Sequence, residues 1–213
     1  MKAARGPTLK RIAFYRGRRD EAPNQILARE LAAKRDAAGI REIANGLRHD
    51  EPAVQSDCVK VLYEVGYIRP ELIAKYTPEF LILLAGRNNR LVWGAMAALA
   101  AVAEVRPKAI YDHRREIIRA MKAGSVITVD QAVLALAKTA ASSPSRRVNL
   151  LPALYQHLST CRTKAVPQHA EKIAPAVDKN GRARFVAILS RRMPEMTPSQ
   201  RSRVRKVVRQ IEG

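Results

Sequence analysis

Helix-breaking residues, proline or glycine, recur in the sequence every 37 residues. Pro70, Pro107 and Pro144 are spaced by 37 and 37, and the next step of the same length reaches Gly181. A second marker keeps almost the same rhythm, since an apolar stretch opens at intervals of 38, 37 and 37 residues, at Val54, Val92, Val129 and Val166. Two independent markers with one period indicate stacked copies of one supersecondary unit, each burying its apolar face against its neighbours.

Each unit has the spacing of two helices. In the first half, apolar residues fall at i, i+3, i+4 and i+7, as at Ile40, Ile43, Ala44 and Leu47. In the second half a similar stripe begins at each marker valine. Side chains that cap helix N-termini stand four residues before the first three marker valines: Asp50, Asn88 and Ser125. The prolines suit the first turn of the next helix, so the spacing predicts a chain of helical hairpins.

This pattern resembles the HEAT-like repeats of α-solenoids, and the match covers roughly residues 37–177. The resemblance implies an all-α, right-handed superhelix of about four to five antiparallel helical hairpins. We expect a basic segment at 1–20, followed by a single repeat domain at 21–213 with a helical cap at each end. The expected units are 37–69, 70–106, 107–143 and 144–180, with a degenerate unit at 181–213.

One position departs from the family pattern. HEAT-like repeats usually place Arg directly after the marker valine, where it pairs with an Asp of the next repeat. Here the position holds Gln55, Trp93, Asp130 and Pro167. The series of Arg–Asp pairs between repeats is therefore missing, and the stacking of the units is expected to rest on apolar contacts and caps. Because the resemblance implies that the second helices line the concave face, Gln55, Trp93 and Asp130 become candidate binding residues.

The net charge of +20 is concentrated at the two ends of the chain. Residues 1–20 contribute +6 and residues 182–213 contribute +7, which is 13 of the 20 excess charges. Within the second helices of the three clearest units, the stretches 54–64, 91–103 and 129–140 hold only two cations, Lys60 and Lys138. A groove for a duplex would present Lys and Arg to phosphates. A nearly uncharged face with Trp93 among small residues favours a protein or peptide partner.

The basic ends keep a second interpretation open, in which the protein binds nucleic acid. The N-terminal run interleaves basic residues with Phe14 and Tyr15, as phosphate-gripping and base-stacking segments do. The alternative is a solvated tail. The candidate polyanion-binding residues are Lys10, Arg11, Arg16, Arg18, Arg19, Arg201, Arg203, Arg205, Lys206 and Arg209.

Catalysis has little support in the sequence. Trp93 and Asp130 occupy equivalent positions in consecutive units, and HEAT-like alkylpurine DNA glycosylases resemble this in using a carboxylate with tryptophans on such a surface. The chain has one Trp, however, and no basic ridge. We find no nucleotide-binding glycine loop, GxSxG or HExxH motif. We therefore expect a non-enzymatic protein without a cofactor, with base repair as a less favoured variant of nucleic-acid binding.

His157, Cys161 and His169 could form part of a metal site. The first two share a helix face at i and i+4, and His169 follows on the next helix. No CxxC or HxxxH pair anchors the group and a fourth ligand is absent. A half-buried histidine and an inert cysteine are favoured, and no metal is expected.

The remaining features agree with a cytoplasmic protein. Cys58 and Cys161 are far apart and do not form a disulfide framework. The basic N-terminus lacks the apolar core of a secretory signal, and the longest uncharged stretch, 91–103, is shorter than the ~20 residues that span a bilayer. Together these observations predict a cytoplasmic binding or scaffold protein whose concave face holds a protein segment.

Overall fold

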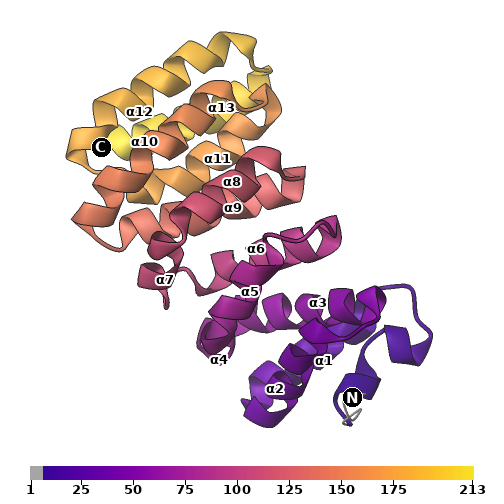
Figure 1. Cartoon of the computed structure of the whole chain (residues 1–213). Coiled ribbons are helices and arrows are strands. Elements are labelled where there is room, and N and C mark those ends of the chain that lie inside the picture. The colour runs from indigo at the N-terminus through magenta and orange to yellow at the C-terminus, as the bar shows by residue number, and fades with distance from the viewer. Residues whose placement is uncertain (1–6) are drawn as a thin grey trace.

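The computed structural model describes residues 7–213, which form an elongated stack of helices (Figure 1). The N-terminal helices lie at one end of the stack and the C-terminal helices at the other. Every regular element of the described residues is an α-helix or a short 3-10 helix. The predicted all-α repeat architecture is confirmed.

The second helices of successive units pack directly on one another. They are α3 (Pro52–Ile68), α6 (Asn89–Val102), α9 (Val126–Ala141) and the shorter α11 (Val166–Ile173). Gly94 allows a close approach of α6 to α3, because a Cβ added there would lie 2.7 Å from Val59 Cγ1 on the neighbouring helix. We call the surface formed by these four helices the inner face.

The first helices of the units are less regular. α2 (Ala37–Asn45) and α10 (Pro144–Thr160) are each one helix, whereas the other two are broken. One consists of α4 (Pro70–Ile73), a 3-10 turn and α5 (Thr77–Leu83); the other consists of α7 (Pro107–Asp112) and α8 (Arg114–Ala123). Pro78 accounts for the first break, since it has no N–H to donate to the preceding turn. We call the surface formed by these first helices the outer face.

The predicted helix caps are correct in two of three cases. Asn88 accepts hydrogen bonds from the backbone N–H groups of Arg90 and Leu91, and Ser125 accepts one from Thr128. The prediction for Asp50 was wrong. Pro52 is the first residue of α3, so the capping position falls on Glu51, whose carboxylate accepts from the N–H of Ala53.

Helices also cover both ends of the stack. α1 (Ala22–Lys34) packs against α3, and the part of segment 1–20 that lies within the described range buries Leu9 and Ile12 in the same core. Residues 1–6 of that segment lie outside the described range. At the other end, α13 (Pro198–Glu212) buries Val204 and Val207.

The degenerate last unit consists of α12 (Lys179–Arg192) followed by α13. Gly181, the fourth position of the 37-residue series, lies in the first turn of α12, as the prolines of the series lie in the first turns of α4, α7 and α10. Asp178 caps α12 by accepting a hydrogen bond from the N–H of Gly181.

Candidate binding face

Three aromatic side chains meet on the inner face and form what we call the aromatic shelf. The ring of Tyr63 lies 5.4 Å from that of Tyr67 on the same helix and 5.7 Å from that of Trp93 on α6, measured between centroids. Tyr63 is buried, Trp93 is half-buried, and Tyr67 is 51% exposed. Stacked and tilted rings at these distances stabilise one another, and the exposed ring offers a preformed apolar contact surface.

The sequence explains how the shelf is built. Tyr63 and Tyr67 are four residues apart on α3, so both project from the same side of that helix. Trp93 comes from the next second helix, directly before the Gly94 that lets the two helices approach. Sequence reasoning singled out Trp93 but missed the tyrosines. Their i, i+4 spacing was the available signal.

The ammonium group of Lys60 lies beside the aromatic shelf and is paired with two carboxylates. Lys60 Nζ lies 2.8 Å from a carboxylate oxygen of Glu21 and 2.8 Å from one of Glu64, and it sits 4.9 Å from the centroid of the Tyr63 ring. Burial alone would lower the pKa of Lys60, but the hydrogen bonds to both carboxylates outweigh it and raise that pKa above its usual value. Lys60 is therefore a fixed charge that neighbouring acids neutralise.

Cross-helix ion pairs continue along the stack. Lys138 on α9 pairs with Glu104 after α6 at 3.5 Å, and Lys172 on α11 pairs with Asp130 on α9 at 2.5 Å. The expectation that stacking rests on apolar contacts and caps alone was wrong. The family's Arg position is lost, but other residues supply charged links between units. Their partners come from different units, so the repeat pattern did not reveal them.

The three candidate binding residues do not form one cluster. Gln55 donates from Nε2 to the carbonyl of His49 at 2.7 Å, close to the start of its own helix. Trp93 contacts α3, whereas Asp130 pairs with α11. Burial would raise the pKa of Asp130, but the nearby His169, at 3.6 Å, and the Lys172 ammonium group lower it below its usual value. Trp93 and Asp130 thus engage opposite neighbours along the stack.

A groove follows the C-terminal half of the inner face. It has a volume of about 540 Å³ and is lined by residues of α9, α11 and the segments that follow α6 and α11, namely Glu104, Leu134, Ala137, Lys138, Ala141, Ser142, Glu171, Lys172 and Pro175. Two carboxylates and two ammonium groups lie in its wall. The inner face therefore combines apolar surface with neutralised charge.

The candidate polyanion-binding residues lie at the two ends of the stack (Figure 1). Three of their side chains are engaged by acids: Arg11 pairs with Glu30 at 2.7 Å, Arg18 pairs with Asp20 at 2.7 Å, and Arg203 holds both carboxylate oxygens of Glu171 at 2.9 and 2.6 Å. Arg201 is half-buried, and further exposed cations lie at both ends: Lys10, Arg16, Arg19, Arg205, Lys206 and Arg209. These two groups do not converge on one surface.

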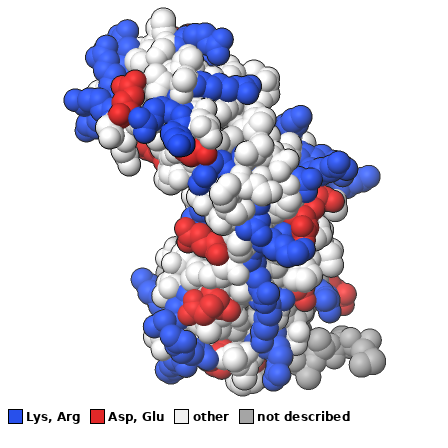
Figure 2. All heavy atoms as spheres, turned by 90° about the vertical axis from the view of Figure 1, so that its left-hand side faces the viewer, with Lys and Arg blue, Asp and Glu red and all other residues white. Residues whose placement is uncertain are grey.

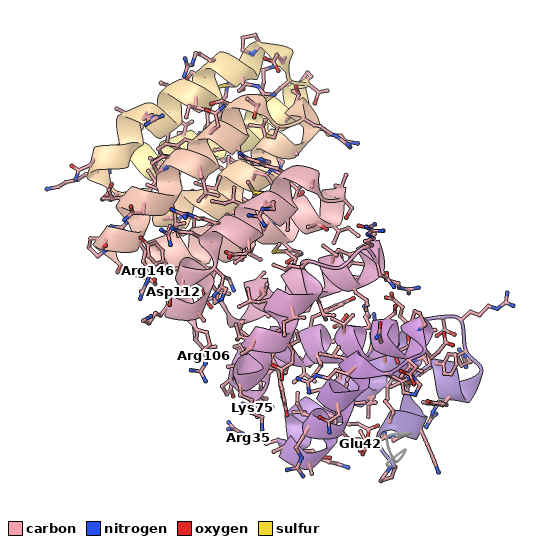
Figure 3. The ribbon with its side chains drawn as sticks, in the orientation of Figure 1. Arg35, Glu42, Lys75, Arg106, Asp112 and Arg146 are labelled. Carbon is pink, nitrogen blue, oxygen red and sulfur yellow. The ribbon has the colours of Figure 1, made fainter. Side chains whose placement is uncertain are left out.

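A further set of cations runs along the outer side of the molecule. Figure 3 shows Arg35, Lys75, Arg106 and Arg146 along one edge of the molecule, with Asp112 among them. Figure 2 views that side directly and shows Lys and Arg from one end to the other, with Asp and Glu in smaller separate patches. We call these four cations the basic edge. Sequence reasoning missed it because the charges repeat only loosely.

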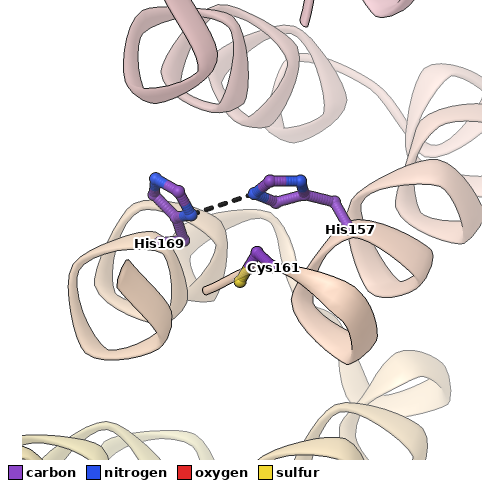
Figure 4. Close-up of side chains that lie close together, drawn as sticks. All are labelled: His157, Cys161 and His169. Carbon is purple, nitrogen blue, oxygen red and sulfur yellow. Dashed lines mark hydrogen bonds between the residues drawn. The ribbon is translucent and has the colours of Figure 1, made fainter. Parts of the chain in front are cut away.

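The residues weighed as a metal site do come together (Figure 4). The ligand atoms of His157, Cys161 and His169 all lie within 4.8 Å of one another, and His157 Nε2 is 2.9 Å from His169 Nδ1. Burial, with a smaller effect of His169, lowers the pKa of His157 to about 4. Burial also raises the pKa of the Cys161 thiol, against the influence of Arg192.

Three solved structures illustrate what this chain is similar to. An engineered protein is 17% identical, with 97% of each chain covered and a TM-score of 0.68. A designed armadillo repeat protein in complex with the peptide (KR)4 is 13% identical, with 99% of this chain and 100% of that chain covered and a TM-score of 0.67. The karyopherin Kap121p, bound to the SUMO protease Ulp1p, is 14% identical with a TM-score of 0.64.

The karyopherin match covers 95% of this chain but only 22% of Kap121p, so this chain corresponds to a short stretch of that solenoid. No protein-family model matches the sequence, and no curated protein matches it at a significant level. Within the described residues, no helix has the length and apolar character needed to cross a membrane. At these sequence identities the likeness shows the fold: the chain is an α-solenoid of the HEAT and armadillo type.

Proposed function

We propose that the protein is a non-enzymatic binding scaffold whose inner face holds a segment of a partner protein, anchored at the aromatic shelf. The shelf carries this proposal. Tyr67 and Ile68 are 51% and 49% exposed at the end of α3, beside the half-buried Trp93. Exposed aromatic residues on a rigid support are the type that dominates protein interfaces.

The charge of the inner face supports a protein partner over nucleic acid. Lys60, Lys138 and Lys172 each pair with a carboxylate from another segment of the chain, Glu21, Glu104 and Asp130 respectively, although the whole chain has a net charge of +20. Phosphate binding relies on cations that can exchange their counterions for phosphates. Similar solved structures were determined with a peptide or a protein bound. The free cysteines agree with a cytoplasmic setting.

The chemistry of the shelf defines the partner segment. An aliphatic or aromatic side chain of the partner would cover the exposed part of Tyr67. The backbone of the partner segment would follow the inner face toward the groove on α9 and α11. The flanking charges would be of both signs, because Glu104, Lys138, Glu171 and Lys172 all line the groove. Such a segment binds through one anchor and several weaker polar contacts.

Selection from a library of random displayed peptides, followed by fluorescence titration of the winners, tests the proposal. We expect the selected peptides to share an apolar anchor. Tyr67→Ala should weaken their binding by about 30-fold or more, as loss of an interface hot spot does. Ile82→Ala on the outer face is the matched control, because Ile82 is 69% exposed and remote from the shelf.

Two results would contradict a protein-binding inner face. One is equal binding of the peptides to both variants. The other is tight binding of DNA or RNA that survives Tyr67→Ala and falls steeply between about 50 and 200 mM salt. The second result would favour the nucleic-acid interpretation, with the terminal cations and the basic edge as its contact residues.

A further inference from the structure

We propose that His157, Cys161 and His169 bind one zinc ion, with the fourth coordination position open to the adjoining cavity. The three side chains come from adjacent elements: His157 lies on α10, Cys161 directly follows that helix, and His169 lies on α11 (Figure 4). Imidazole nitrogen and thiolate sulfur are the ligands that zinc prefers in proteins.

The spacing of the ligand atoms suits a zinc ion. Bonds of about 2.0–2.1 Å to nitrogen in tetrahedral geometry place two ligand nitrogens about 3.3 Å apart. His157 Nε2 and His169 Nδ1 are 2.9 Å apart and share one hydrogen bond. The rings need to separate by only a few tenths of an ångström to admit the ion. Cys161 Sγ lies within 4.8 Å of both nitrogens, close enough to complete the triad with a change of rotamer.

Asp130 is placed to orient one of the ligands. Its Oδ1 lies 3.6 Å from His169 Nε2, on the far side of the ring from His157. When Nδ1 binds the metal, Nε2 carries the proton and faces this carboxylate. A carboxylate that accepts from the second nitrogen of a ligating histidine is a common support of zinc sites. Lys172 holds the same carboxylate from α11, so the orienting group is itself fixed.

The binding step is balanced in charge and protons. Both imidazoles bind as neutral rings, so each keeps one proton on its other nitrogen. The Cys161 thiol loses its proton to solvent as the zinc–sulfur bond forms, which releases one proton for each ion bound. Arg192 donates to the carbonyl oxygens of Leu158 and Cys161 at 2.8 Å, and its positive charge favours the thiolate. The oxidation state of every group is unchanged.

A cavity supplies room for a fourth ligand. It has a volume of about 400 Å³ and includes all three proposed ligands and Asp130 in its wall. Residues of α8, α9, α10, α11 and the adjoining turns complete the lining. A structural zinc site normally has four protein ligands, whereas a site with three keeps a position for water or an exchangeable ligand. Three protein ligands beside a cavity correspond to the second kind of site, which has an open coordination position.

Cobalt(II) in place of zinc provides the test, because it reports its ligands by absorption. The full chain, first treated with chelator, is titrated with Co²⁺ alone. We expect one equivalent to produce a thiolate-to-cobalt band in the near ultraviolet together with the visible bands of tetrahedral cobalt. Addition of Zn²⁺ should remove both. Cys161→Ser should abolish the thiolate band, and Cys58→Ala, which removes the other thiol, should retain it.

Two further variants separate ligation from structural effects. His157→Gln alters a half-buried residue and should weaken cobalt binding by at least 100-fold while circular dichroism remains helical. Asp130→Asn should preserve the spectrum and weaken binding by about 10–100-fold, as expected of a positioning residue. The absence of a thiolate band in the parent chain would overturn the proposal. So would a band that persists in Cys161→Ser, or unchanged affinity in His157→Gln.

Discussion

The inner and outer faces of the solenoid are built from the same repeat but differ in regularity and charge. On the inner face, α3, α6 and α9 are continuous helices in direct contact, and carboxylates pair with their cations. On the outer face, two of the first helices are broken, and a groove of about 540 Å³ between α5 and α7 is lined by Lys75, Arg106 and apolar residues. The inner side therefore holds the stack together.

This difference means that the inner face supplies most of the stability, whereas the outer face carries exposed charge. In a repeat protein, stability is approximately the sum of each unit and its interfaces with its neighbours. Those interfaces lie mainly between second helices, where small residues such as Gly94 permit close packing. The first helices α2, α5 and α8 contact chiefly the second helix of their own unit, whereas α10 packs mainly on α9 of the preceding unit. The outer face also carries exposed Lys and Arg, such as Lys75 and Arg106. Charge can therefore change on the outer face with little effect on the fold.

The largest effect on stability is expected from truncating a buried apolar side chain of the inner face, in comparison with an exposed one of the outer face. Leu99 is fully buried on α6, and we expect Leu99→Ala to lower the free energy of unfolding by about 2–5 kcal/mol, through lost burial and the cavity left behind. Ile82 on α5 is 69% exposed, so Ile82→Ala should change it by less than about 0.5 kcal/mol. Urea unfolding followed by circular dichroism measures both values. Equal losses would contradict the comparison.

The second test removes the central charge beside the aromatic shelf. Lys60→Met should lower the free energy of unfolding at neutral pH by about 1–3 kcal/mol, because Glu21 and Glu64 lose a shared hydrogen-bond donor. Hydrogen bonding to Lys60 lowers the pKa of Glu21, so its contribution is present above its ordinary pKa of 4.5 and is lost as the pH falls through the lowered value.

The pH dependence distinguishes this charge effect from lost packing. The difference between parent and Lys60→Met should be largest between about pH 6 and 9 and should shrink below about pH 4, as Glu21 becomes protonated. Thermal unfolding across that range is the measurement, and a matched Lys75→Met variant on the outer face is the control. A difference that stays constant from pH 3 to 8 would assign the effect to packing.

Much of the fold could be predicted because it is encoded by local signals. The 37-residue period, the apolar stripes and the caps at Asn88 and Ser125 are properties of neighbouring residues, and each of these predictions is confirmed. The break at Pro78 was equally local but was overlooked in favour of the larger pattern. The cap at Glu51 depended on a single residue, Pro52, which shifts the helix start by one position.

The candidate sites were less predictable because they depend on how helices pack. Lys60 and Lys138 could be identified as the cations of the second helices, but their partners Glu21 and Glu104 lie on other elements. His157 and His169 are twelve residues apart, on either side of a turn whose geometry brings their rings to 2.9 Å. Apolar spacing predicts which residues are buried; it does not predict which polar groups meet across an interface.

The third test compares two capping residues. Asn88→Ala should lower the free energy of unfolding by about 1 kcal/mol, because the N–H groups of Arg90 and Leu91 lose their acceptor. Asp50→Ala should have an effect below about 0.5 kcal/mol, since the carboxylate of Glu51 occupies the capping role at α3. Thermal unfolding of both variants checks this. A larger loss for Asp50→Ala would restore the original assignment of the cap.

The smallest effect on stability is expected at the basic edge. Lys75 and Arg106 line the outer groove, and a Lys75→Ala, Arg106→Ala double variant should unfold within about 0.5 kcal/mol of the parent, because exposed cations add little to folding. Peptide binding at the aromatic shelf should also be unchanged. If the protein binds DNA or RNA through this edge, each lost phosphate contact should reduce the slope of log affinity against log salt by about 1. A reduced slope with intact stability would assign the outer charge to nucleic acid, whereas weaker peptide binding would show that the two faces are not independent.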